Sequence, residues 1–178
     1  MRKLLFLSTV LLLLSVMSLA GVCVAGGPQS KPFVAKWTGT LYDAGFCDAN
    51  NVLTVNVGRG VSSLIGPSSF VFMYCIPLDL ASPGAGWGVI TAATGDTLHV
   101  RISDLTVDIT QIPPAWSEHE TLIGGTGKFA NADGETDSQG TWTSETDPFP
   151  TGAGGISVPP LLLAPQDWVG TSHGSMRF

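Results

Sequence analysis

The sequence predicts an all-β protein, a single closed or nearly closed antiparallel barrel of about eight strands. Short segments of alternating apolar and polar residues recur between clusters of Gly, Pro, Asn and Asp, which is typical of antiparallel strands. No amphipathic helix is visible after the first 25 residues. Many short strands with near-regular turns favour a barrel or a sandwich, and a last strand that reaches the C-terminus favours closure against the first.

The N-terminal segment has the order of a secretory signal. Arg2 and Lys3 precede a run without charge, and Ala25 ends a small-residue stretch suited to cleavage. A retained anchor would need about 20 apolar residues, and serines and a glycine interrupt this run. Lipidation at Cys23 is a minor alternative, because Val22 precedes it where the resemblance to lipoprotein signals calls for Gly, Ala or Ser. We expect a signal peptide at 1–25, one domain at 26–178, and a secreted or periplasmic product with no stable membrane span.

The first half of the domain is expected to supply strands at 33–42, 51–57, 70–76 and 87–93, and residues 61–65 could continue the second of these beyond a bend. Residues 33–42 place Trp37 on an apolar face, and 51–57 set three apolar residues against Thr54 and Asn56. The glycines around Arg59 predict a bulge or bend. Residues 70–76 are apolar on both faces, so we expect this strand to be central or covered.

The second half is expected to supply strands at 97–103, 105–110, 119–123, 134–145 and 167–178. Thr94-Gly95-Asp96 predicts the hairpin before the first of these. If its apolar residues face inward, His99 and Arg101 point to solvent. The Pro/Gly-rich stretch at 147–166 is predicted as a loop, which could be a lid, an interaction segment or an edge strand.

Two cysteines, Cys47 and Cys75, remain after signal cleavage, and an even pair in an oxidising compartment predicts a disulfide. The alternative is that Cys75 is a buried free thiol. Cleavage also changes the formal charge from -6 to -8, because it removes two cations. An acidic surface repels phosphate backbones, so we expect no nucleic-acid partner.

The most distinctive segment is Leu122-Ile123-Gly124-Gly125-Thr126-Gly127-Lys128-Phe129-Ala130-Asn131-Ala132-Asp133-Gly134. It resembles the GGTG-x-F-x-x-A-x-G segment of the allene oxide cyclase and dirigent barrel-like superfamily, and in particular of uncharacterised secreted bacterial members. The residues themselves predict a structural corner, in which glycines allow a tight exit from a strand and Thr126 caps a helical turn. The corner residues are Gly124, Gly125, Thr126, Gly127, Phe129, Ala132 and Gly134.

No constellation of residues specifies a reaction. The same segment fits neither a dinucleotide-binding motif, which needs a long helix and a parallel sheet, nor a phosphate-binding loop, which needs Ser or Thr at Phe129. The three histidines are scattered, so we expect no metal site, and no cofactor motif is present. Most carboxylates fall in turns or on polar strand faces.

Two functions remain open. The favoured one is a non-catalytic secreted barrel that binds a small apolar molecule or a partner surface. The alternative, implied by the resemblance, is a cyclase or isomerase that acts in the barrel lumen, and an inward-facing acid beside an apolar cavity would favour it. The candidate wall residues are Trp37, Phe70, Phe72, Trp87 and Trp142.

Overall fold

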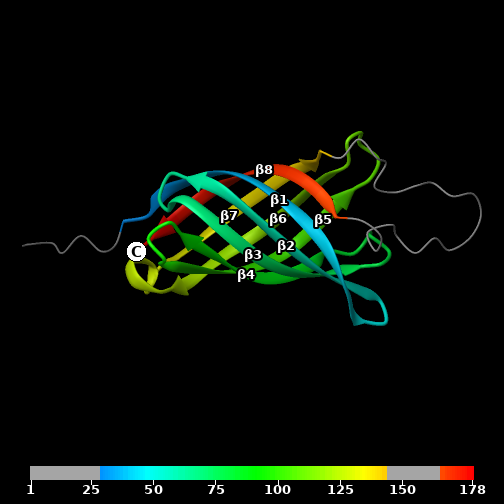
Figure 1. The fold of residues 1–178 in the computed structure, drawn as a ribbon, viewed down its shortest axis with the longest axis horizontal. Helices are drawn as coiled ribbons and strands as arrows, with labels where there is room; N and C mark the ends of the chain where they lie inside the picture. The colour runs from blue at the N-terminus through cyan, green and yellow to red at the C-terminus, as the bar shows by residue number, and fades with distance from the viewer. Residues whose placement is uncertain (1–28, 144–164) are drawn as a thin grey trace, which may run out of the picture.

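The computed structural model describes residues 29–143 and 165–178, which form one closed antiparallel barrel (Figure 1). Each strand pairs with the next in the chain, and β8 pairs with β1. The fold class and the closure are therefore confirmed. The strands are β1 (Lys31–Asp48), β2 (Asn51–Ser62), β3 (Gly66–Pro77), β4 (Gly84–Ala92), β5 (Thr97–Asp108), β6 (Ala115–Gly125), β7 (Asp133–Trp142) and β8 (Gln166–Arg177), with a single 3-10 turn, η1 (Gly127–Phe129).

Aromatic rings fill much of the barrel interior. An eight-stranded barrel is just wide enough for its own side chains, and here large rings lie over glycines of the neighbouring strand. A Cβ atom on Gly88 would lie 2.0 Å from the ring of Phe72, and one on Gly60 would lie 2.1 Å from the ring of Trp37. These glycines leave room for rings that a bulkier neighbour would displace.

In β2, polar side chains face the barrel interior and apolar side chains face outward, which is the reverse of what its alternating pattern suggests. Thr54 and Asn56 are buried inside the barrel, whereas Val55 and its apolar neighbours point outward. The β1–β2 turn pairs Asp48 with Asn51 and so fixes the register of β2. Because successive side chains of a strand alternate between its two faces, this register decides which residues face inward. The predicted bulge around Arg59 is also wrong, since pairing with both neighbours is continuous there.

Two further expectations about strands can be compared with the structure. β3 is central, since it pairs with both β2 and β4, but its outer face is not covered, because Val71 is 52% exposed there. The predicted strands at 97–103 and 105–110 are one strand, β5, interrupted only where Asp104 takes a φ of 54°. His99 and Arg101 point to solvent, as predicted.

The glycine-rich segment forms the corner between β6 and β7. Gly124 and Gly127 have φ values of 90° and 55°, which favour glycine, and Phe129 is fully buried in the core. Thr126 precedes η1, but its side chain does not cap the turn. Its hydroxyl instead accepts a hydrogen bond from the Thr97 backbone N–H at 2.9 Å, which ties the corner to β5.

A disulfide between Cys47 and Cys75 joins β1 to β3, as predicted. Within the two described ranges, no helix is long and apolar enough to cross a membrane. The predicted signal peptide at 1–25 and most of the predicted 147–166 loop lie outside the described residues.

Candidate functional site

A small cavity lies inside the barrel near one end. β3, β5 and β7 finish there and β6 and β8 begin there, at the right-hand end in Figure 1. Its volume of about 30 Å³ has room for about two water molecules. We call this space the lumen cavity. It is lined by Leu41, Asn56, Tyr74, Ile76, Leu105, Val107, Trp116, Glu118, Trp142 and Trp168.

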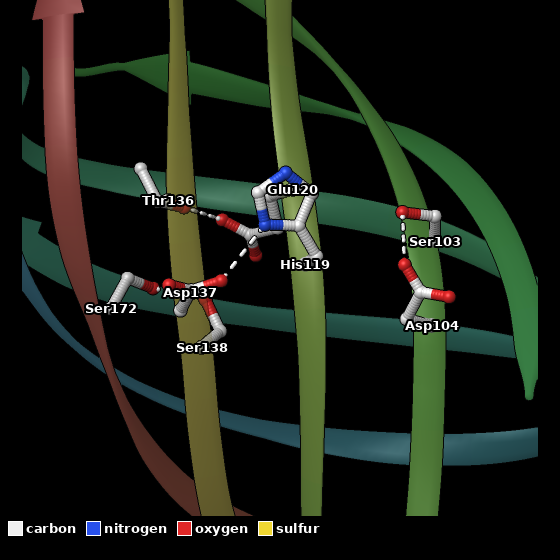
Figure 2. Close-up of polar contacts among 8 residues, drawn as sticks. All are labelled: Ser103, Asp104, His119, Glu120, Thr136, Asp137, Ser138 and Ser172. Carbon is white, nitrogen blue, oxygen red and sulfur yellow. Dashed lines mark hydrogen bonds and ion pairs between the residues drawn. The ribbon is translucent and has the colours of Figure 1, made fainter.

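Two carboxyl groups of β6, Glu118 and Glu120, point into the barrel. Each side chain is only 5% exposed. The Glu118 Oε1 atom lies 3.4 Å from the hydroxyl of Tyr74, which donates to it. Figure 2 shows the second carboxyl, Glu120, which accepts a short hydrogen bond from Thr136 of β7. Buried carboxyl groups are rare unless they are paired or hydrogen-bonded, so this pair is the most unusual feature of the interior.

Burial raises the pKa of both acids. For Glu118, removal from water is the main cause, and the nearby Glu120 carboxyl raises the pKa further, to well above its ordinary value. Burial also raises the pKa of Glu120, but hydrogen bonds from Thr136 and Ser138 oppose the rise. The two carboxyl groups interact with each other, and the raised pKa values favour the protonated form of each. A neutral Glu118 can donate a hydrogen bond.

Two polar atoms of the lumen cavity lack partners within the described part of the chain. No N–H or O–H group there donates to Glu118 Oε2, and no acceptor there binds the Trp142 Nε1 proton. Both residues are 5% exposed and both line the cavity. An unpartnered buried polar atom costs free energy, so these atoms are suited to a water or ligand in the cavity.

Several other polar atoms of the interior pair with one another, although the buried Thr54 hydroxyl does not pair within the described residues. The Trp37 Nε1–H donates to Ser172 Oγ at 2.8 Å, and Ser172 lies 2.6 Å from Ser138 Oγ (Figure 2). Near the cavity, the Trp168 Nε1–H donates to Asn56 Oδ1 at 2.9 Å. These bonds hold the two indoles in place beside the carboxyl pair.

The outer face of the same strands carries a separate polar cluster. His119 Nδ1 lies 2.8 Å from Asp137 Oδ1, and His173 is opposite Asp137 on β8 (Figure 2 shows the first pair). The hydrogen bond to Asp137 raises the pKa of His119. Across residues 29–143 and 165–178, no three His, Cys, Asp or Glu side chains are arranged to hold a metal ion.

The structure places four of the five wall residues predicted from the sequence inside the barrel. Trp37, Phe70, Phe72 and Trp142 are buried in the lumen, although only Trp142 lines the cavity. Trp87 lies outside, where it is 57% exposed, because it alternates with Gly86 and Gly88, which take the inward positions on either side of it.

The carboxyl pair was missed by the sequence reasoning. One signal in the sequence indicates it. The two acids and their apolar neighbours are spaced two residues apart along β6, so all four share one face of the strand: Trp116, Glu118, Glu120 and Leu122.

Comparison with solved structures finds a likeness to a pterocarpan synthase dirigent protein, with a TM-score of 0.49 and 10% sequence identity over 84% of this chain and 87% of that one. No protein-family model matches the chain, and no curated protein is significantly similar to it. A likeness this distant carries no argument about function, which must come from the site itself.

Proposed function

We propose that this protein is a secreted barrel that binds a small, neutral, largely apolar molecule at the lumen cavity. The signal-like N-terminus and the Cys47–Cys75 disulfide support export. The observation that carries the binding proposal is the pair of unpartnered polar atoms, in Glu118 and Trp142, among apolar walls. Apolar pockets with a few convergent polar groups are typical ligand sites.

The chemistry of the cavity selects the polar group of the ligand. A protonated Glu118 and the Trp142 indole both donate hydrogen bonds, so the ligand is expected to present an acceptor oxygen, such as a carbonyl or ether. A carboxylate ligand would bring a negative charge close to Glu118, Glu120 and Tyr74, whose ionisation is already disfavoured. Because the cavity has room for only about two water molecules, we expect only the oxygen-bearing end of the ligand to enter it.

A matched pair of probes tests this selection. Acetophenone and benzoate have similar size, but only acetophenone is neutral with a carbonyl acceptor. In an NMR titration at pH 7, acetophenone is expected to shift the indole N–H signal of Trp142, and benzoate is expected to leave it unchanged. Glu118→Leu should weaken acetophenone binding, whereas Glu135→Gln on the exposed face of β7 should not. Equal binding of both probes would refute the proposal.

A second candidate function rests on the same carboxyl group. The pKa of Glu118 is raised well above its ordinary value, and its carboxyl is buried beside a cavity and interacts with the Glu120 carboxyl, which could exchange a proton with it. Such a group can act as a general acid, as a cyclase or isomerase in the lumen would require. Wild-type protein and the Glu118→Gln variant would be produced in the native host and their bound molecules compared. Different molecules would indicate turnover, and the same molecule would indicate binding alone.

A further inference from the structure

The hydrogen bonds of Glu118 decide which of its two oxygens carries the proton of the neutral acid. Oε1 accepts the hydroxyl of Tyr74 at 3.4 Å, and a carboxylic acid accepts best at its carbonyl oxygen, so the proton belongs on Oε2. Oε2 is buried and has no partner within the described part of the chain. Neutral Glu118 therefore offers the lumen cavity one unused donor, whereas ionised Glu118 offers only acceptors.

No buried cation in the described part of the chain balances the carboxyl pair. Of the side chains that line the lumen cavity, only Glu118 and Tyr74 are ionisable, and those from β1, β2, β5, β7 and β8 are uncharged. Burial and the two carboxyl groups raise the pKa of Tyr74 well above 10, so the phenol stays neutral. The charge of His119 favours ionised Glu120, but its ring lies on the outer face of β6. A buried charge without a partner is costly, so an ionised pair must draw in water.

The size of the lumen cavity makes water and ligand compete for it. Its volume of about 30 Å³ has room for about two water molecules, which is also the space that the oxygen-bearing end of a ligand would fill. The neutral acid donates to an acceptor oxygen of the ligand. The ionised acid repels that oxygen and instead accepts hydrogen bonds from water. The protonation state of Glu118 therefore decides which of the two occupies the cavity.

We propose, on the basis of the ligand site proposed above, that the lumen cavity binds its ligand together with a proton and releases both when the carboxyl pair ionises. The released proton passes to water. Because burial raises the pKa of both carboxyl groups, release occurs above the ordinary range of a glutamic acid. Above the midpoint of ionisation, each pH unit lowers the binding-competent fraction, and so raises the Kd, about tenfold. By linkage, the bound ligand must shift this midpoint to higher pH.

Isothermal titration calorimetry with acetophenone from pH 5 to pH 9 tests this coupling. The wild type is expected to bind more weakly as the pH rises, and to take up a proton on binding near the midpoint, which makes the heat depend on the ionisation enthalpy of the buffer. Glu118→Gln keeps an N–H donor but cannot ionise, so it should lose most of this pH dependence. His119→Gln is the matched control, since it removes a group of β6 that titrates in the same range on the outer face, and it should keep the dependence.

A measurement on the wild type alone guards against a variant that fails to fold. In a carbon NMR titration of the side-chain carboxyl groups, acetophenone should move the ionisation midpoint of Glu118 to higher pH. Near-UV circular dichroism separates release from unfolding, and the comparison ends at the highest pH where the tryptophan signal is intact. An unmoved midpoint would overturn the proposal, as would a Glu118→Gln protein that keeps the wild-type pH dependence. Binding that is equal at every pH refutes only the coupling, whereas no binding at any pH refutes the ligand site itself.

Discussion

The buried carboxyl pair makes a definite prediction about stability and pH. Glu118 and Glu120 have pKa values raised above 4.5 in the folded protein, so each favours its protonated form there. Stability from such a group is fully present below the unfolded pKa and is lost as the pH rises through the folded pKa. Each carboxyl that is protonated in the folded state and ionised in the unfolded state lowers the free energy of unfolding by about 1.4 kcal/mol per pH unit.

The window from pH 5 to pH 6 isolates this effect. Four aspartates have lowered pKa values, so the stability that they contribute is lost only as the pH falls below their ordinary pKa of 3.8. They are Asp48, Asp79, Asp108 and Asp133. His119 has a raised pKa, so the stability that its charged form contributes is lost as the pH rises above its ordinary pKa of 6.5. Among these shifted groups, only the carboxyl pair changes the stability within the window.

Glu118→Gln removes one of the two titrations. Urea unfolding at pH 5 and pH 6 would give the free energy of unfolding of both proteins. We expect the variant to gain about 1.4 kcal/mol relative to the wild type between these pH values, because it has no carboxyl at this position to ionise on unfolding. Glu135→Gln, on the exposed face of β7, should show no such gain. Parallel pH profiles for wild type and Glu118→Gln would refute a protonated Glu118.

Three further variants test the barrel itself. Replacing Cys47 and Cys75 by Ser should lower the free energy of unfolding by about 3–4 kcal/mol in urea titrations, since the disulfide closes a 28-residue separation; an unchanged midpoint would contradict this. Gly88→Leu should lower the melting temperature strongly because its side chain would overlap the ring of Phe72, and a tolerated leucine would show that the interior is looser than described. Phe129→Ala should cost about 3–5 kcal/mol, because this fully buried ring plugs the β6–β7 corner; a loss below 1 kcal/mol would argue against the plug.

Local pattern was enough to predict the barrel and its corner. Alternation and turn residues located the strands, and the glycines around Thr126 located the turn between β6 and β7. The pairing of Cys47 with Cys75 followed from their number and the expected compartment. These features depend on residues close in sequence or on simple counting, so a single sequence contains them.

The interior polar groups could not be predicted in the same way. A carboxyl such as Glu120 is normally placed on the solvent side, because burial without partners is costly. Its partner Thr136 belongs to the next strand, and only the β6–β7 register brings the two opposite each other. Likewise, Asn56 faces inward where it accepts the Trp168 indole N–H, and these residues are 112 positions apart. Such pairings appear only when the barrel is closed.

Native mass spectrometry of the mature protein from its own host tests the central claim most directly. The intact protein would be weighed, then denatured, and any released molecule identified. The account predicts one small, neutral molecule with an acceptor oxygen per chain, retained by Glu135→Gln and lost from Glu118→Leu. An empty wild-type protein, or a carboxylate bound equally by both variants, would contradict a ligand site at the lumen cavity.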